Sequence, residues 1–260
     1  MGEHGTWFDY LNRIDGWRHF NEWAQHKLGR SNEPFLLVFN ASGWTLTHVL
    51  ITLLVLAFTT WGVIAFYRGL SDKNKGVIPP RTMNLRNFFE YTAESVYGMV
   101  EGSMGEHNAA RFFPLIGALW MFILFSNLIG LIPGFMAPTD TLKTNVGIAI
   151  FVFLLTHYLG VKEHGLAYFK HFLGPSLALA PLMLPIELIS HLARPVSLSV
   201  RLMGNMFADH KVVMSFFALV PILVPLPFML LGVLVCLIQA LVFCSLTMVY
   251  IGMAIEHEEH

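Results

Sequence analysis

The sequence predicts an all-α polytopic membrane protein. Of its 260 residues, 55% are apolar and only 13% are charged, whereas globular domains average about 25% charged residues. The mean hydropathy is +0.59, and the apolar residues gather in runs long enough to cross a hydrocarbon core of ~30 Å. This composition disfavours a soluble enzyme, and a net charge of −1 disfavours a nucleic-acid-binding surface.

The N-terminal segment, residues 1–43, is expected to be an exposed or interfacial tail. It mixes basic and acidic residues with Trp7, Trp17 and Trp23, and tryptophan favours the boundary between membrane and water. It lacks the basic-then-apolar order of a cleavable signal. Residues 44–260 are expected to form a single membrane domain.

Five apolar segments of that domain are predicted to be spans. They cover about residues 44–67, 112–133, 145–161, 178–219 and 228–255. The last two are too long for upright helices, because residues 186–219 and 228–255 would extend ~50 Å and ~42 Å at 1.5 Å per residue. We therefore expect both to be strongly tilted or to lie across other helices. Three prolines between them, Pro221, Pro225 and Pro227, are predicted to form a turn.

Residues 84–108 are predicted to form an amphipathic helix that does not span. Glu90, Glu94 and Glu101 alternate with aromatic and aliphatic residues, and the first two share a face by their i, i+4 spacing. Three glutamates are too costly in lipid. The helix is therefore expected to lie along the membrane or to pack on the bundle.

The basic residues predict the orientation of the membrane domain. Six of them lie between the first and second spans, and Lys162 and Lys170 follow the third, whereas residues 134–140 on the opposite side carry none. Loops rich in lysine and arginine face the cytoplasm. We therefore expect the N-terminus outside and the C-terminus inside.

Arg201 is the most unusual residue of the fourth span. A charge inside the membrane costs ~2.5–3.5 kcal/mol, and arginine does not escape this cost by losing its proton. No acidic residue stands three or four positions away, where a helical partner would lie. Two interpretations follow: an ion pair with another helix of the chain, or a fixed positive charge that faces an external carboxylate or an aqueous cleft.

Helical geometry places several polar residues on the same stripe as Arg201. At 100° per residue, six side chains fall within one narrow sector of the fourth span; they are Glu187, His191, Arg194, Arg201, Asn205 and Asp209. His210 and Lys211 lie off this stripe. Groups that exchange protons therefore lie on both sides of Arg201, which does not. This order suits two proton access routes that are separated by a fixed positive charge. Gln239 of the last span has two interpretations: its amide makes a structural hydrogen bond between helices, or it has a functional role beside Arg201.

The twelve histidines invite a metal or haem interpretation, which their placement disfavours. His157, His164 and His171 are seven residues apart, but they fall at a span end and in a loop. The tail at residues 256–260 is expected to be a solvated terminus. No phosphate-binding loop, dinucleotide fingerprint or nucleophile motif is present. We therefore expect no cofactor, no metal site and no catalytic residue in this chain.

Two motifs resemble subunit a of F-type ATP synthases. They are residues 194–207 (RPVSLSVRLMGNMF) and residues 125–134 (FSNLIGLIPG). Other positions that match this family are Phe113-Pro114, Pro138-Thr139, Asn145, residues 239–243 (QALVF), Val249-Tyr250 and the acidic C-terminus. The resemblance extends from about residue 35 to the end and includes the order of five spans with two tilted C-terminal helices.

The resemblance implies a proton-channel stator subunit that faces a ring of c subunits and contacts the b subunits of the peripheral stalk in the inner membrane of a bacterium. Arg201 falls on the family's essential arginine, and Asn205 and Gln239 fall on polar positions near it. Glu187 matches an acidic position of the cytoplasmic half-channel, beside which His191 is a candidate relay. His210 falls on an outer half-channel position that is acidic or histidine in the family.

One departure from the family pattern concerns the outer half-channel. Its usual partner on the last helix, seven residues before the glutamine, is Gly232 here, so Asp209 is the candidate replacement. The alternative function is a secondary transporter or a proton-translocating subunit of a respiratory complex. Such transporters often carry inverted repeats, and none is found in this sequence. A haem-binding membrane subunit is disfavoured by the histidine placement.

Overall fold

The computed structural model describes residues 19, 46–70, 85–132, 135–165, 168, 180–219 and 225–255. Over these residues the regular structure is helical, as predicted. The elements are α2 (Leu46–Leu70), α3 (Leu85–Met104), α4 (Glu106–Gly130), the short 3₁₀ helix η2 (Pro138–Asp140), α5 (Leu142–His164), α7 (Ala180–Leu219) and α8 (Pro225–Ile255). The tail predicted for residues 1–43 lies outside the described residues except for residue 19, as does the predicted tail at 256–260.

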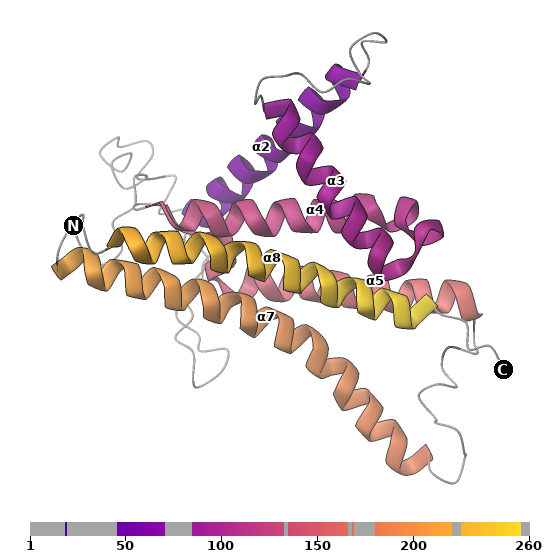
Figure 1. Cartoon of the computed structure of the whole chain (residues 1–260). Helices are drawn as coiled ribbons and strands as arrows, with labels where there is room; N and C mark the ends of the chain where they lie inside the picture. Colours follow the sequence, from indigo (N-terminus) through magenta and orange to yellow (C-terminus); the bar gives the residue numbers. More distant parts are fainter. Residues whose placement is uncertain are drawn as a thin grey trace.

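Four helices form the main bundle. In Figure 1, α4, α5, α8 and the C-terminal part of α7 run alongside one another, whereas α2 and α3 cross them at an angle. A core of fully buried side chains from α4, α7 and α8, including Ile116, Leu202 and Phe243, holds the bundle together. The N-terminal turns of α7 diverge from the bundle (Figure 1), and residues 181–186 are all exposed.

The spans are confirmed in part. Among the described residues, three helices are long and apolar enough to cross a membrane: Glu106–Gly130, Leu142–His164 and Leu226–Ile255. The apolar part of α2, His48–Ile64, is shorter, and the long α7, which carries five charged residues, is not one of the three. The chain is thus a multi-span helical protein, and the count of five spans and the tilt of the last two helices stay predictions.

The amphipathic character of α3 is confirmed. Its buried face consists of Phe89, Thr92, Val96 and Val100, which recur at the three- and four-residue spacing of one helix face. This face packs against α4, α2 and α8. Glu94 and Glu101 are exposed on the opposite side. The helix therefore packs on the bundle, one of the two placements that we expected.

The boundary between α3 and the second span differs from the prediction. We expected one helix over 84–108 and a span from 112, but α3 ends at Met104 and α4 begins at Glu106. The cause is Gly105, whose φ of +79° lies in a region that glycine adopts without steric cost. Glu106 in the first turn of α4 suits the positive end of the helix dipole, so this polar segment extends α4.

The prolines around α8 also correct the sequence prediction. Pro225 and Pro227 do not belong to a turn: they lie in the first turn of α8, where proline is tolerated because its missing N–H has no helical partner. Pro221 lies outside the described residues. The other boundaries agree with the prediction to within three residues.

Interior prolines do not divide the fourth span. α7 is one helix of 40 residues that contains Pro185 and Pro195. Beside Pro195, the hydroxyl of Ser199 donates a hydrogen bond of 2.7 Å to the Pro195 carbonyl. The polar stripe predicted for this segment therefore lies along a single helix.

The helices are held together by different interactions at the two ends of the bundle. At one end the Arg111 guanidinium at the start of α4 pairs with Glu163 at the end of α5, with 2.7 Å between Nη1 and Oε1. At the other end Thr139 Oγ donates to Asn127 Oδ1 at 2.6 Å, and Asn145 Nδ2 donates to the Thr139 carbonyl at 2.7 Å. We call the end near Glu163 the histidine end, because His157 and His191 lie there. The other end, which holds Asn127, Thr139 and Asn145, is called the amide end.

Candidate functional site

Glu187, His191 and His157 meet at the histidine end of the bundle. On α7, His191 Nε2 donates to Glu187 Oε1 at 3.1 Å, the i, i+4 contact that the polar stripe predicted. The His191 imidazole also faces that of His157 on α5, with ring centroids 5.2 Å apart and planes at 71°. The Glu187 side chain is 42% exposed and that of His191 only 13%. Three proton-exchanging groups therefore connect an open surface to the interior of the bundle.

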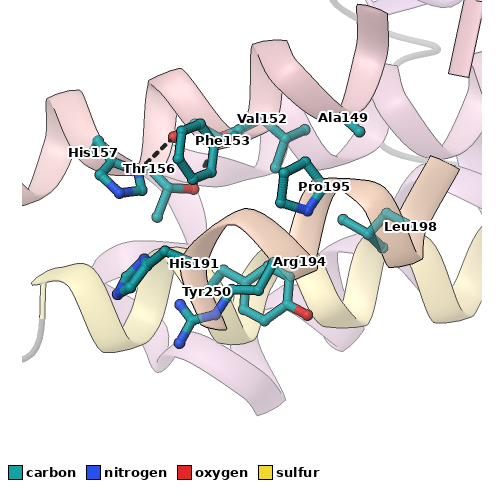
Figure 2. Close-up of a pocket in the computed structure, with 10 residues that line it drawn as sticks. All are labelled: Ala149, Val152, Phe153, Thr156, His157, His191, Arg194, Pro195, Leu198 and Tyr250. Atoms are coloured by element: carbon teal, nitrogen blue, oxygen red, sulfur yellow. Dashed lines mark hydrogen bonds between the residues drawn. The ribbon is translucent and has the colours of Figure 1, made fainter. Parts of the chain in front are cut away.

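Arg194 lies one turn further along α7 and faces α8. Its guanidinium carbon is 5.0 Å from the centroid of the Tyr250 ring, close enough for a cation–π contact. A small cavity lies between α5, α7 and α8 (Figure 2), with room for about one water molecule. Its lining consists of Ala149, Val152, Phe153, Thr156, His157, His191, Arg194, Pro195, Leu198 and Tyr250.

Arg201 lies between two anchored levels of the antiparallel pair α7 and α8. Arg194 contacts Tyr250 on one side of it, and Asn205 Nδ2 donates to Gln239 Oε1 at 2.8 Å on the other. Arg201 itself is exposed, and within the described part of the chain no ion pair involves it. The interpretation as an ion pair within the chain therefore finds no support there. Its charge is available to a group outside the chain.

The contact between Asn205 and Gln239 bears on the two interpretations of Gln239. Its amide makes a helix–helix hydrogen bond, and that bond lies one helical turn from Arg201. Both interpretations of Gln239 are therefore compatible with its position, because the bond fixes a polar amide beside the arginine.

Asp209 is half-buried on α7, one turn beyond Asn205. One of its carboxylate oxygens is buried and has no hydrogen-bond partner among the described residues, and the carboxylate lies within electrostatic range of Cys236 on α8. His210 belongs to α7, but its side chain lies outside the described residues. Lys211 is exposed, with Nζ 5.6 Å from the centroid of the Phe207 ring.

Gly232 lies against Leu131, the residue that follows α4. A Cβ at this position would be 2.6 Å from Leu131 Cδ2, inside van der Waals contact. Leu131 is itself buried, with 7% of its surface exposed. The space that a side chain at position 232 would need is therefore filled by leucine, so a larger residue there requires the Leu131 side chain to move.

Sequence reasoning missed His157 and Tyr250 as parts of the cluster at the histidine end. His157 was considered only as a metal or haem ligand, and among the described residues no three His, Cys, Asp or Glu side chains are arranged to hold a metal. A signal was present, because His157 lies on α5 in a stretch without lysine, arginine, aspartate or glutamate between Lys143 and Lys162. Its partner, however, stands 34 positions away, and sequence spacing does not reveal such a pair.

The chain is similar to one protein family over most of its length. Residues 49–252 match the family model described as ATP synthase A chain. ATP synthase subunit a 2 of Syntrophotalea carbinolica is 52% identical over 200 residues, which cover 76% of this chain and 84% of that one. ATP synthase subunit a of Trichlorobacter lovleyi is 51% identical over 197 residues, 76% and 85% of the two chains. ATP synthase subunit a of Geobacter sulfurreducens is 54% identical over 172 residues, 66% and 75%.

Proposed function

The chain belongs to the family of ATP synthase A chains, the non-catalytic, proton-translocating stator subunits of F0, and on this premise we propose how its residues divide the work. Arg201 is the barrier charge between two half-channels. Glu187, with His191 as a relay, serves the cytoplasmic half-channel, and Asp209 and His210 serve the outer one. Asn205 and Gln239 are the supporting polar groups. The observation that carries this assignment is the exposed Arg201, with proton-exchanging groups on both sides of it along α7.

Electrostatics gives Arg201 its role in this mechanism. A carboxylate of a c-ring subunit crosses lipid in its protonated form. Beside Arg201 the ionised form is favoured by roughly 4 kcal/mol at 4 Å and an effective dielectric of 20. The carboxylate therefore releases its proton toward Glu187 and takes one up from the outer route as the ring turns. The same positive charge repels a proton that would cross directly, so a membrane potential worth about 2.3 kcal/mol per charge per 100 mV drives rotation.

The c-ring is the partner that we assign to the outward face of α7 and α8. Val196, Val200, Leu237 and Leu241 are large apolar side chains that are exposed near the level of Arg201. An apolar face that surrounds one positive charge suits a ring surface of apolar helices with one carboxylate each. We further propose that the b subunits of the peripheral stalk contact the remaining lipid-facing surface of the chain.

We propose that the histidine end faces the cytoplasm of a bacterial cell and that the chain lies in the inner membrane. Arg111 and Lys162 are both at this end, whereas the described residues from 135 to 140 at the amide end carry no basic residue. Loops rich in basic residues stay on the cytoplasmic side. A cysteine at the exposed position of Glu94 on α3 should therefore react with a thiol probe from the cytoplasmic face of sealed vesicles. Labelling from the outside alone contradicts the orientation.

The arginine barrier is tested by substituting Arg201. Arg201→Ala should abolish ATP-driven proton pumping and let protons leak through vesicles stripped of the catalytic head, because nothing then separates the two routes. Arg201→Lys keeps a charge but loses the planar guanidinium and its permanent protonation, so coupled ATP synthesis should also be lost while the complex stays assembled. Lys211→Ala, which removes an exposed positive charge from the same helix, is the matched control for net charge. Retention of proton pumping by Arg201→Ala overturns the assignment.

A further inference from the structure

The cytoplasmic half-channel assigned above has a gap in its middle. Arg201 and Glu187 are fourteen residues apart on α7, which amounts to ~21 Å at 1.5 Å per residue. A proton moves between groups within hydrogen-bond reach or through a water molecule, so two groups at this separation do not exchange one directly. The side chains that line α7 between them, and those that face it from α5 and α8, decide how the gap is crossed.

His157 of α5 lies inside this gap. Its ring faces that of His191 with 5.2 Å between centroids, and both line the cavity between α5, α7 and α8 (Figure 2). That cavity also reaches Arg194 and Pro195, on the side of His191 nearer Arg201. The two imidazoles and the water-sized space beside them therefore occupy part of the stretch between Arg201 and Glu187, from the level of His191 to that of Leu198.

The hydrogen bond of His157 to its own helix fixes the roles of its two ring nitrogens. Its Nδ1 lies 2.9 Å from the carbonyl oxygen of Phe153. Because a carbonyl oxygen only accepts, Nδ1 carries the hydrogen in this contact. Nε2 is then the nitrogen at which this ring accepts a further proton. The Phe153 ring, with its centroid 4.2 Å from that of His157, packs against the imidazole and holds its orientation.

The charged and titratable groups around the pair come from every packed element. On α7, Glu187 bonds His191, and Arg194 lines the same cavity. On α8, Tyr250 lies under the Arg194 guanidinium. Beyond the end of α5, the buried Tyr168 has its ring centroid 5.9 Å from that of His157. One carboxylate and one guanidinium therefore lie beside the two imidazoles.

We propose that His157 is a further proton-exchanging residue of the cytoplasmic half-channel and that it forms a two-histidine relay with His191. The proposal rests on the function proposed above. A proton released near Arg201 binds His157 Nε2 through the cavity, the N–H bond breaks as the proton passes to His191, and His191 delivers it to Glu187 and the cytoplasm. Each transfer breaks one bond to hydrogen and forms another, with no net oxidation or reduction, and the sequence reverses when the enzyme pumps.

The test measures proton flux through the whole ATP synthase in membrane vesicles as the pH of the cytoplasmic side is varied. His157→Gln keeps a polar side chain of similar size but does not titrate. We expect proton flux to fall about threefold, below the ~10²–10⁴ of a positioned acid–base group in catalysis, because water replaces part of the relay. The stronger signature is the pH profile: the dependence of flux on cytoplasmic pH should flatten, because a glutamine side chain neither binds nor releases a proton. His157→Gln combined with His191→Gln should be slower than either alone.

Two further variants separate the relay from packing and from the proposed function. Tyr158→Phe, at an adjacent side chain that is 63% exposed, should retain the parental flux and profile. His157→Phe keeps the ring packing against Phe153 and should behave like His157→Gln. A uniform loss of flux with the parental pH profile, or failure of both His157 variants to assemble, makes His157 a packing residue and overturns the relay. If Glu187→Gln lowers proton flux but His157→Gln leaves flux and pH profile at the parental values, the relay alone is overturned. If Glu187→Gln itself retains the parental flux, the proposed half-channel is overturned.

Discussion

The two ends of the bundle differ in how many groups are able to carry a proton. At the histidine end, Glu187, His191 and His157 are in contact from the surface to a cavity. At the amide end, Asn127, Thr139 and Asn145 form a buried network of hydrogen bonds whose groups do not titrate near neutral pH. Among the side chains described beyond Asn205 on α7, Asp209 is the acidic one.

This difference indicates that the titratable groups are redundant at the histidine end, whereas the packing is rigid at the amide end. The histidine end has several titratable groups, so losing one leaves neighbours that conduct. The amide end has closed packing, where Gly130 meets the Ala137 side chain and Gly232 meets Leu131, so the geometry is fixed and few groups share the proton. The function of one end should therefore tolerate substitution better than that of the other.

The most direct test of this difference between the two ends is to neutralise one carboxylate at a time. Asp209→Asn should lower proton flux about tenfold and Glu187→Gln only about threefold, because two imidazoles are able to take over the acid–base role of Glu187, whereas His210 is the single partner proposed for Asp209. Both substitutions are nearly isosteric, so each is a control for the other. The measurement is proton flux in vesicles at matched amounts of assembled complex. A larger loss in Glu187→Gln contradicts the redundancy of the histidine end.

A second test probes the closed packing around Gly232. Gly232→His forces a side chain onto Leu131 and should destabilise the assembled subunit by about 1–3 kcal/mol, the usual cost of overpacking. It should be detected as a lower temperature for loss of the subunit from the purified complex. Leu131→Ala makes space, so the double variant Gly232→His/Leu131→Ala should recover part of that loss. No recovery means that contacts other than Leu131 exclude a side chain at 232.

A third, smaller effect is expected at the hydrogen bond that anchors α7 to α8 beside Arg201. Asn205→Ala and Gln239→Ala each leave one amide without its partner. A double-mutant cycle should yield a coupling energy of about 0.6–1.7 kcal/mol, the range of such bonds within membranes. Thermal unfolding of the complex supplies the four stabilities that the cycle needs. Strict additivity means that the two amides act independently.

The smallest effect is expected for the ion pair that ties α4 to α5. Its partners, Arg111 and Glu163, are 41% and 30% exposed, and exposed pairs contribute about 0–1 kcal/mol. Exchanging them in Arg111→Glu/Glu163→Arg should restore most of what either single variant loses. Stability is compared at low and high salt, since screening weakens the pair. A loss above about 2 kcal/mol that is independent of salt contradicts an electrostatic role.

Sequence reasoning went furthest where periodicity decides the structure. The alternation of three glutamates with apolar residues predicted that α3 is amphipathic, and the stripe on α7 placed Glu187 and His191 on the face where they are in contact. Both depend on residues within two turns of one helix, where the pitch fixes the geometry.

The remainder depends on contacts between helices that are distant in sequence. The pairing of His157 with His191, the packing of Leu131 on Gly232 and the bond from Asn205 to Gln239 are set by how the helices lie against each other. Local boundaries were missed for another reason: Gly105 ended α3 earlier than the hydrophobic pattern indicated, because a single positive φ interrupts a helix regardless of the residues that follow.

The continuity of α7 also has a mechanical meaning. A rotor pushed past a fixed charge exerts an equal and opposite force on that charge, and in this chain the force would act on one exposed arginine in the middle of a 40-residue rod. The rod is clamped on both sides of this point, to Tyr250 toward its beginning and to Gln239 toward its end. A beam held on both sides of a load deflects less than a beam held on one side only, so these two contacts resist sideways deflection of α7 under torque.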